Sequence, residues 1–397
     1  MEKLKIGVFG LFRGLEYVKQ FNGRPDTTVA AVCDWDEERV KEAVSLCKEK
    51  VKICGSFEEL LESGIDAVYI ANCFHEHARC AILAMRHGID VLSECTSAVT
   101  MQECVELWET VEETGRKYML AENEPYAKQN LELARVYREG SLGPLLYAEG
   151  EYNHYIEEGS KKYIPGLCEG KYHWRKYMPR TYYLTHSLGP LMFMTGEKPV
   201  SVSTIAVHSE NAPADWTVKD AFAQMSCRTN KGSLFRFTGW TSMPGGYGFR
   251  VVGENGLAET GRGLRNYVSL IYKDNKVPKG LHERELYEPD WPSSSEKVSE
   301  SAHGGADWWV AKAFADYVLR GETPFFDYRC GILMSAVGIL GWRSVLENGK
   351  TLEIPDFSKK EVRDLYRNDD LSPFPDREGN VKMPCSTWQL GKGDFEQ

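Results

Sequence analysis

Residues 6–14 read Ile6-Gly-Val-Phe-Gly10-Leu-Phe-Arg-Gly14, a short apolar run that passes into a turn containing glycines. The run predicts a strand over Ile6–Phe9, and the pattern behind the turn predicts a helix through Tyr17–Phe21. Glycines in such a strand–turn–helix unit let the backbone approach a pyrophosphate, which sits at the helix N-terminus. The turn therefore predicts dinucleotide-binding residues at Gly10, Phe12, Arg13 and Gly14.

The end of the next apolar run supports this interpretation. Asp34 follows Val29–Cys33, 20 residues after Gly14, and a carboxylate there can accept hydrogen bonds from both ribose hydroxyls of an adenosine. It would repel a 2′-phosphate, and the next residue is Trp35 rather than arginine, so NAD is favoured over NADP. The turn is imperfect, because Phe12 stands where G-x-G-x-x-G has its second glycine and the turn is one residue short. Glycines of an ordinary tight turn are the alternative interpretation.

Apolar runs and helical patterns continue to alternate up to about residue 123. Further strands are predicted at Val51–Ile53, Ala67–Ala71, Val91–Leu92 and Lys117–Leu120. Helices are predicted between them, and Thr100 with Glu103 forms a capping-box pattern at the start of the last one. This rhythm predicts a parallel, doubly wound sheet. We expect a dinucleotide-binding Rossmann domain over residues 1–123.

After Asn123 the pattern becomes that of an antiparallel sheet. A helix is predicted from about Pro125 to Glu139. Strand-like runs separated by Gly, Asn and Pro then dominate, at 145–152, 200–208, 221–228, 232–240 and 248–252. Two helices are predicted near 307–319 and 333–347, and the polar residues 359–397 are expected to wrap over the surface. We expect a second α/β domain over residues 124–397 for substrate binding and oligomerisation.

The composition narrows the classes of function. The 397 residues carry a net charge of −10 without a Lys/Arg-rich block, which argues against a nucleic-acid surface. No leader precedes the first strand and no stretch reaches 18 uninterrupted apolar residues, so we expect a soluble, cytoplasmic protein without a membrane partner. The eleven cysteines form no C-x-x-C pair, which predicts reduced thiols rather than disulfides or a zinc site.

Five further motifs occur along the chain. They are Ile70-Ala-Asn72-Cys-Phe-His-Glu-His77, His87-Gly-Ile-Asp-Val-Leu-Ser-Glu94-Cys95-Thr96, Met119-Leu-Ala-Glu122-Asn123, His303-Gly-Gly-Ala-Asp307 and Ile354-Pro-Asp-Phe357. Together they resemble the Gfo/Idh/MocA oxidoreductase family. The resemblance implies a Rossmann domain plus an α/β domain on a large, mostly antiparallel open sheet, with the substrate at their junction. It implies cofactor-binding roles for Asn72, His77, Glu94, Cys95 and Asn123, and substrate contacts for Glu94 and His303, the latter approaching from the sheet domain.

Two departures from the family pattern stand out. Glu94-Cys95-Thr96 replaces E-K-P, whose lysine is commonly catalytic, and Tyr182 rather than Asp precedes His186 by four residues. We expect the Cys95 thiol to be a neutral space-filler rather than a nucleophile. A branch that lacks this lysine is the NAD-dependent glycoside hydrolases, known for N-acetylgalactosaminidase activity. The chain is similar to that branch at Glu151-Tyr-Asn-His154, His173-Trp-Arg175 and Tyr183-Leu-Thr-His186-Ser-Leu-Gly-Pro190.

This second resemblance implies a glycosidase that holds NAD tightly. The sugar is oxidised at C3, the aglycone is eliminated across C1–C2, water is added, and the ketone is reduced by the same cofactor. By position, Tyr152 would be the base at C2 or the partner of the ketone oxygen, and His186 would act at C3. Tyr183 and His154 complete the predicted catalytic group, and Arg175 and Trp174 would bind the sugar. The many aromatic residues between 152 and 183, Tyr163 and Tyr172 among them, suit sugar faces or equally an oligomer interface.

Several alternatives stay open. The chain is otherwise a sugar 3-dehydrogenase that releases a 3-keto sugar, or a sugar- or nucleotide-binding protein without activity. A divalent metal on Glu151, His154, His173 and His186 is disfavoured, because Glu151 and His154 point to opposite faces of a strand, and no metal site is predicted. Trp240, Tyr247 and Arg250 are weaker candidates for substrate contact. The expected partners are a small carbohydrate or glycoside and further copies of the chain, as a homodimer or homotetramer.

Overall fold

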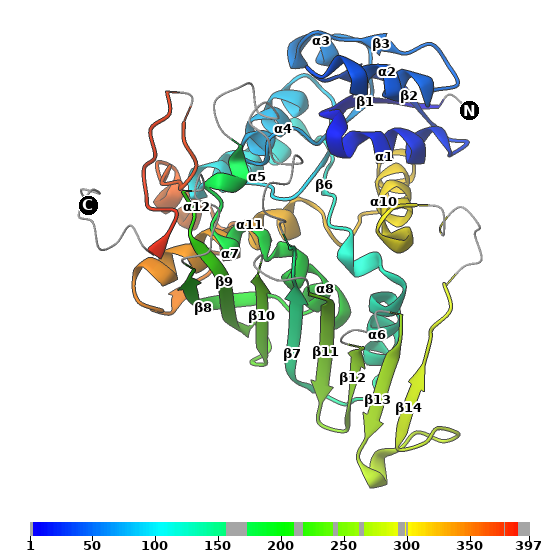
Figure 1. Ribbon diagram of the computed structural model, residues 1–397, viewed down its shortest axis with the longest axis vertical. Helices are drawn as coiled ribbons and strands as arrows, with labels where there is room; N and C mark the ends of the chain where they lie inside the picture. Colours follow the sequence, from blue (N-terminus) through cyan, green and yellow to red (C-terminus); the bar gives the residue numbers. More distant parts are fainter. Residues whose placement is uncertain are drawn as a thin grey trace. The chain divides into compact units, whose positions relative to one another are not determined.

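The computed structural model describes residues 3–155, 173–209, 217–240, 245–261, 266–292, 298, 301–376 and 378–387. The chain forms two compact units. The first contains Met1–Asn123, Glu296–Ser335 and Asp356–Asp370, and the second contains Glu124–Ser295, Ala336–Pro355 and Leu371–Gln397. Figure 1 shows the chain coloured by residue number, from blue at the N-terminus to red at the C-terminus.

The first unit is built on a six-stranded sheet in the order β3-β2-β1-β4-β5-β6. All of its strand pairs are parallel. The strands are β1 (Leu4–Phe9), β2 (Thr27–Cys33), β3 (Lys52–Ile53), β4 (Ala67–Ile70), β5 (Asp90–Ser93) and β6 (Tyr118–Leu120). The strand order reverses between β1 and β4, and this is where open α/β sheets bind ligands. The predicted doubly wound Rossmann sheet is confirmed.

Helices connect these strands and complete the first unit. They are α1 (Leu11–Asn22), α2 (Glu37–Ser45), α3 (Phe57–Leu61), η1 (Phe74–Glu76), α4 (His77–Arg86), α5 (Met101–Thr114), η6 (His303–Gly305), α10 (Ala306–Arg320) and α12 (Lys360–Tyr366). The predicted capping box is confirmed at α5: the Glu103 N–H donates to Thr100 Oγ1 at 3.0 Å, and the Thr100 N–H donates to Glu103 Oε2 at 3.2 Å. Such a box satisfies two N–H groups that the helix itself leaves unpaired.

Helix α12 lies in the stretch that we expected only to wrap over the surface. Arg363 of α12 and Arg367, the residue after its last turn, pair with Glu109 of α5 at 3.3 Å and 2.7 Å. A helix this short is marginal on its own, so packing and ion pairing within the unit stabilise it. These ion pairs join residues far apart in the sequence and leave no local sequence pattern, so the helix was not predicted.

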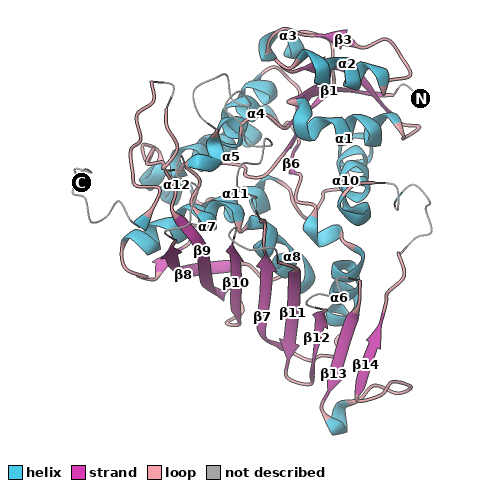
Figure 2. Ribbon diagram, in the orientation of Figure 1, coloured by secondary structure: helices cyan, strands magenta, loops and turns pink. Residues whose placement is uncertain are grey.

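The second unit is built on a nine-stranded sheet in the order β14-β13-β12-β11-β7-β10-β9-β8-β15, which forms one layer in Figure 2. The strands are β7 (Leu145–Tyr152), β8 (Pro199–His208), β9 (Asp220–Thr229), β10 (Leu234–Trp240), β11 (Tyr247–Gly253), β12 (Gly256–Thr260), β13 (Val268–Tyr272), β14 (Arg284–Tyr287) and β15 (Leu352–Glu353). Strands β7 and β10 pair in parallel and the other described pairs are antiparallel. The predicted large, mostly antiparallel sheet is confirmed, although its short strands β12 to β15 were not predicted.

Helices accompany this second sheet. They are η2 (Glu124–Tyr126), α6 (Lys128–Arg138), η4 (Trp174–Lys176), α7 (Arg180–Tyr183), α8 (Thr185–Thr195), η5 (Asp274–Lys276) and α11 (Tyr328–Leu346), the last of which begins in the first unit. Helix α8 packs directly on β7, because a Cβ atom at Gly150 would lie 2.7 Å from the Ser187 carbonyl oxygen. This close approach brings the residues at the start of α8 to the end of β7.

Helix α11 is long and apolar enough to cross a membrane by length and composition. However, 78% of its most apolar window is buried inside the structure, as in the core helix of a globular protein. Its Trp342 is fully buried, and its indole Nε1 donates to the Pro384 carbonyl oxygen at 2.7 Å.

Candidate functional site

The turn between β1 and α1 has the backbone that a pyrophosphate site needs. Gly10 has a φ of +86°, and a Cβ atom there would lie 2.4 Å from the Ala71 carbonyl oxygen at the end of β4. Gly10 precedes α1 and has no side chain to cap it, so the first turn of the helix leaves N–H groups that a ligand can bind, apart from that of Leu11, which donates to Asp34. The cradle around Gly10 and the N-terminus of α1 therefore fit the phosphates of a dinucleotide.

Asp34 is held rigidly beside this turn. Its Oδ2 atom accepts from the Leu11 N–H at 2.5 Å, and its Oδ1 atom accepts from the Asp36 N–H at 2.8 Å. The carboxylate thus stays at the carboxyl end of β2, where the predicted ribose contact requires it. Phe12 follows Leu11, which binds Asp34, and Trp35 follows Asp34 itself; their side chains are 51% and 56% exposed. Exposed aromatic rings close to a polar group suit a ligand that carries an aromatic base.

Arg13 was predicted to contact the nucleotide, and the structure shows its guanidinium bound by two carboxylates of the same unit. Its Nε donates to Glu94 Oε1 at 3.1 Å, and its Nη1 and Nη2 donate to Asp307 at 2.9 Å and 2.5 Å. Glu94 Oε1 also accepts from the Tyr69 hydroxyl at 2.5 Å. Arg13 therefore ties the turn after β1 to the end of β5 and to the start of α10.

Asp307 is the centre of this group and was not among the predicted site residues. It is fully buried, and it accepts further hydrogen bonds from Asn123 Nδ2 at 3.0 Å and from His303 Nδ1 at 2.8 Å. Burial alone would raise the pKa of Asp307, but the Arg13 charge and the His303 hydrogen bond hold that pKa well below its usual range. The His303-Gly-Gly-Ala-Asp307 motif could have indicated Asp307. A carboxylate that follows two glycines and stands in the first turn of a helix has its position fixed by the helix backbone.

His303 differs from our expectation. Residues 296–335 belong to the first unit, so His303 does not approach from the sheet domain as the resemblance implied. It has a φ of +54° and stands at the start of η6, where it bonds to Asp307 four residues on. Its predicted substrate contact stays a prediction.

The other predicted cofactor residues gather at the carboxyl ends of β4, β5 and β6. His77 is buried between backbone oxygens, with Nδ1 3.2 Å from the Thr96 carbonyl and Nε2 3.3 Å from that of Asn72. Burial lowers the pKa of His77, so the ring is neutral at physiological pH. Cys95 is also buried, and its thiol donates to Glu122 Oε2 at 3.5 Å. Predicted nucleotide residues thus line one edge of the parallel sheet.

In the second unit the four predicted catalytic rings come together. Tyr152, the last residue of β7, lies 4.6 Å from His186 of α8 between ring centroids. Tyr183 lies 5.8 Å from Tyr152 and 5.0 Å from His186, edge to face in both cases. His154 lies 6.1 Å from Tyr152 and 5.7 Å from Tyr183. We call these four residues the ring cluster.

Tyr247, one of the weaker candidates for substrate contact, packs against the ring cluster. Tyr247 pairs with Tyr152 across β11 and β7, and the two rings stack at 4.5 Å with an angle of 10°. Arg250, by contrast, is held on the sheet by Glu259 at 2.7 Å and Glu149 at 3.3 Å. The register of β11 against β7, which the sequence did not reveal, places Tyr247 against the ring cluster.

Arg175 is fixed at the side of the ring cluster. Its guanidinium lies 4.3 Å over the Trp174 ring and 4.8 Å over the Tyr183 ring, and Nη2 donates to the Tyr183 hydroxyl oxygen at 3.1 Å. The Arg175 N–H donates to His173 Nδ1 at 3.2 Å, which caps η4. The predicted sugar-binding residues Arg175 and Trp174 therefore adjoin the predicted catalytic ones.

Burial sets the protonation states in this cluster. Burial, with the Arg175 charge adding to it, lowers the pKa of His154 to about 3, and the same two causes lower the pKa of His173 to about 3. Burial, together with Tyr183 and Tyr247, raises the pKa of Tyr152 well above its ordinary value. A neutral His154 imidazole and a protonated Tyr152 phenol therefore face one another at neutral pH.

Two sequence-based interpretations of this region concern a metal site and the aromatic residues between 152 and 183. Among the described residues, the ligand atoms of Glu151, His154, His173 and His186 do not gather within 4.8 Å of one another. Tyr163 and Tyr172 of the predicted aromatic group lie outside the described residues, as does Cys168.

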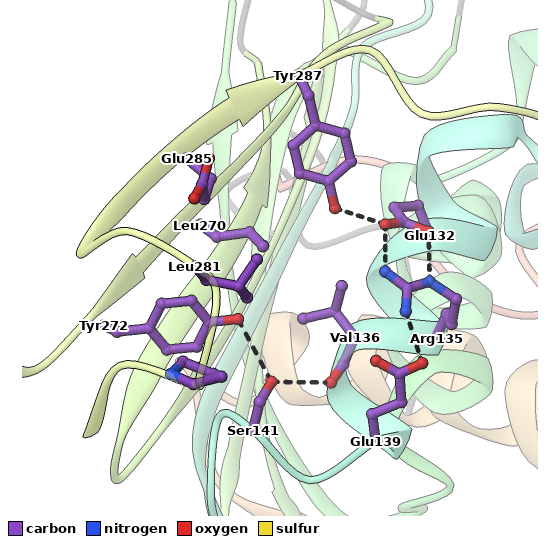
Figure 3. Close-up of a pocket in the computed structure, with 11 residues that line it drawn as sticks. Glu132, Arg135, Val136, Glu139, Ser141, Leu270, Tyr272, Leu281, Glu285 and Tyr287 are labelled. Carbon is purple, nitrogen blue, oxygen red and sulfur yellow. Dashed lines mark hydrogen bonds and ion pairs between the residues drawn. The ribbon is translucent and has the colours of Figure 1, made fainter.

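A separate pocket of about 490 Å³ lies between α6 and the strands β13 and β14, and Figure 3 shows the residues that line it. No predicted site residue lines this pocket. Its polar groups bind one another: the Tyr287 hydroxyl donates to Glu132 at 2.5 Å, and Arg135 binds Glu132 and Glu139. Since these groups are already satisfied, the ring cluster is the better candidate for sugar chemistry.

Known protein families match both the N-terminal and the C-terminal parts of the chain. Residues 4–122 match the oxidoreductase family with an NAD-binding Rossmann fold, and residues 196–364 match the C-terminal domain of glycosyl hydrolase 109. Together these matches cover well over half of the chain. A glycosyl hydrolase family 109 protein of Stenotrophomonas maltophilia (strain K279a) is 26% identical over 413 residues, which cover 90% of this chain and 89% of that protein.

Solved structures show the same fold. Levoglucosan dehydrogenase in complex with NADH and L-sorbose superposes with a TM-score of 0.74 at 16% identity, over 90% of this chain and 100% of its own. An oxidoreductase from Agrobacterium radiobacter in complex with NAD+, L-tartaric acid and magnesium gives a TM-score of 0.70 at 15% identity, over 89% of this chain and 98% of its own. The similarity extends over both units.

Proposed function

We propose that this chain, which belongs to the Gfo/Idh/MocA oxidoreductase family, cleaves glycosides with NAD as a tightly held catalyst. In general terms it is an NAD-dependent enzyme, either a glycosidase or a sugar dehydrogenase. One observation carries the proposal: Tyr152, His154, Tyr183 and His186 form a single ring cluster, in which Tyr152 and His186 are buried. Gly10, Asp34 and the N-terminus of α1 would hold the cofactor. When bound, NAD+ supplies a hydride acceptor for C3 of the sugar and returns the hydride after hydrolysis.

His186 and Tyr152 have different roles at C3 of the sugar. His186 stands in the first turn of α8 against the Tyr152 ring, and a neutral imidazole there can take the proton of the C3 hydroxyl. Tyr152 keeps its proton, because burial raises its pKa well above the ordinary value. A protonated phenol is a poor base but a good hydrogen-bond donor, so we assign Tyr152 to the C3 oxygen rather than to the C2 proton.

Tyr183 is the group best placed to act at C2. Its hydroxyl oxygen accepts a hydrogen bond from Arg175, and a donated bond from a cation stabilises negative charge on oxygen. We therefore assign to Tyr183 the removal of the C2 proton, which the neighbouring C3 ketone acidifies. The C1–O bond to the aglycone then breaks as the C1–C2 double bond forms, and the aglycone oxygen takes up a proton. Water then adds its oxygen to C1 while C2 regains a proton. His154 stays neutral, and its buried Nδ1 has no hydrogen-bond partner among the described residues, so it can bind a sugar hydroxyl.

The discriminating assay uses aryl glycosides with and without added NAD+. Aglycone release without net NADH is expected. Stoichiometric NADH with an intact glycosidic bond would instead identify a sugar dehydrogenase, and ligand binding without turnover would identify a binding protein. The sugar and the anomer are varied in parallel, because elimination from a 3-ketone does not require one anomeric configuration.

A glycoside labelled with deuterium at C2 tests the assignment of Tyr183. The wild-type enzyme is expected to release product in which hydrogen from solvent has replaced the label. Tyr183→Phe should lose aglycone release by about a hundred-fold or more. Retention of the label at C2 during wild-type turnover would rule out elimination.

A further inference from the structure

The C-terminal segment 371–387, described except for residue 377, is hydrogen-bonded to the rest of the second unit near its end. Trp342 of α11 donates from Nε1 to the Pro384 carbonyl oxygen at 2.7 Å, and the Lys219 N–H donates to Ser386 Oγ at 3.1 Å. The Thr387 N–H donates to Asp220 Oδ2 at 2.7 Å, and its hydroxyl binds the other carboxylate oxygen. The segment lies beyond residue 364, where the match to the glycosyl hydrolase 109 domain ends. It is therefore a feature of this chain that the matched domain does not include.

Phe374 of this segment packs against α7. Its ring lies 5.4 Å from that of Tyr182, edge to face at 81°, and both rings are almost completely buried. The Phe374 N–H donates to Ser372 Oγ at 3.1 Å, which fixes the turn that presents the ring. An edge-to-face pair of this kind adds about 0.5–1.5 kcal/mol to the contribution of the buried area.

Tyr182 and Tyr183 are neighbours on α7, and they serve two different contacts. Tyr182 meets Phe374, whereas Tyr183 meets His186 at 5.0 Å and receives the Arg175 hydrogen bond. Consecutive residues on a helix point about 100° apart, so a shift of α7 moves both rings together. The contact with Phe374 is thus coupled mechanically to the geometry of the ring cluster.

Helix α7 has only four residues, Arg180–Tyr183. A single helical turn has no stability of its own, and its position depends on what packs around it. Helix α11 supports it from one direction, since a Cβ atom at Gly338 would lie 3.1 Å from the Thr181 carbonyl oxygen. The C-terminal segment supplies a second support through Phe374.

We propose that residues 371–387 are a buttress of the ring cluster and that Phe374 is a positioning residue, which holds Tyr183 against His186 through Tyr182. A displacement of about 1 Å in a reacting group can cost about a hundred-fold in rate, so the buttress controls turnover without touching the sugar. The effect on turnover rests on the function proposed above. The effect on α7 does not.

The test compares Phe374→Leu with Leu371→Ala, a control at an exposed leucine of the same segment (44% exposed). Amide hydrogen exchange of residues 180–195 reports on α7 and α8 without any substrate. Phe374→Leu is expected to speed exchange in these residues by about ten-fold and to leave the β1–α1 region unchanged. The control should match the wild type in both regions.

Kinetics separate positioning from a loss of folded protein. Below the unfolding temperature, Phe374→Leu is expected to lower kcat by about ten-fold and to change KM and the Kd for NAD+ by less than about two-fold. Phe374→Tyr, which keeps the ring, should restore most of both losses. Wild-type rates of exchange and turnover in Phe374→Leu would overturn the proposal.

If Phe374→Leu does not fold, Thr387→Val replaces it. This variant removes only the hydroxyl bond to Asp220 and should raise exchange in 180–195 and lower kcat by about two- to five-fold; unchanged values would overturn the buttress. If the wild type releases no aglycone from any glycoside, the proposed function fails, while hydrogen exchange still decides the buttress.

Discussion

Arg13 and Asp307 lie 294 residues apart in the sequence, and two hydrogen bonds of 2.9 Å and 2.5 Å join their side chains. The Asp307 side chain is fully buried and the Arg13 side chain is 23% exposed, so water screens the pair poorly. The pair joins the first turn of α1, whose N-terminus would hold the cofactor phosphates, to the start of α10. The position of that turn thus depends on a helix from a distant part of the chain.

Asp307→Asn should therefore destabilise the protein and weaken NAD binding together. Arg13 keeps Glu94 as a carboxylate partner in this variant, so the loss of the charge-assisted bonds to Asp307 should cost about 1.5–3 kcal/mol of unfolding free energy. Urea unfolding and titration with NAD+ measure the two effects, and we expect a Kd about ten-fold higher. Asp316→Asn on the same helix is the control, because its partners Lys312 and Arg320 are 41% and 46% exposed. An unchanged NAD+ affinity in folded Asp307→Asn would contradict this coupling.

Gly10→Ala should lose NAD affinity through a clash at the end of β4. The φ of +86° costs an alanine about 1–2 kcal/mol, and the added Cβ would meet the Ala71 carbonyl oxygen at 2.4 Å. Gly88→Ala is a matched control, because Gly88 has a φ of +80° with nothing within 4 Å of the added Cβ. Both variants should lose stability, but only Gly10→Ala should raise the Kd for NAD+ by about ten-fold or more. Equal affinities in the two variants would disprove a close cofactor approach at Gly10.

Asp34→Ser should reduce the preference for NAD over NADP. The carboxylate would repel a 2′-phosphate, and its removal should shift the ratio of the two dissociation constants by about ten-fold towards NADP. Calorimetric titration with both cofactors measures this ratio. The exposed Glu37→Gln changes the charge by the same amount nearby and should leave the ratio unaltered. If both variants shift the ratio equally, general charge and not the Asp34 contact sets the preference.

Acid should destabilise the second unit through its buried histidines. The pKa of His173 falls from 6.5 to about 3 on folding, because the ring is buried beside Arg175. Below pH 6.5 the unfolded chain gains a proton that the folded chain does not, so the unfolding free energy falls as the pH decreases towards 3. Each such group contributes a slope of up to about 1.4 kcal/mol per pH unit.

The variant His173→Gln isolates this contribution. Unfolding free energies are measured from neutral pH down to about pH 4, and the variant should show a shallower decline than the wild type. The exposed His87→Gln serves as the control, and it should follow the wild-type curve. Parallel curves for all three proteins would show that His173 does not titrate on folding.

The sequence alone determined the local elements of the first unit. The strand, turn and helix around Gly10, the capping box of Thr100 and Glu103 and the position of Asp34 depend on contacts within a few residues. Propensity, spacing and polarity encode such contacts directly, so they are legible without a structure. The motifs Glu151–His154 and Tyr183–Pro190 likewise contain the four rings that the tertiary structure brings together.

Only the tertiary structure decided which side chains meet. The Arg13–Asp307 pair, the stacking of Tyr247 on Tyr152 and the contact of Phe374 with Tyr182 each join residues from separate elements. Strand register and helix packing create these contacts, and both depend on the whole set of burial and hydrogen-bond energies rather than on any one segment. The same reason explains α12, whose stability comes from ion pairs with Glu109 and not from its own seven residues.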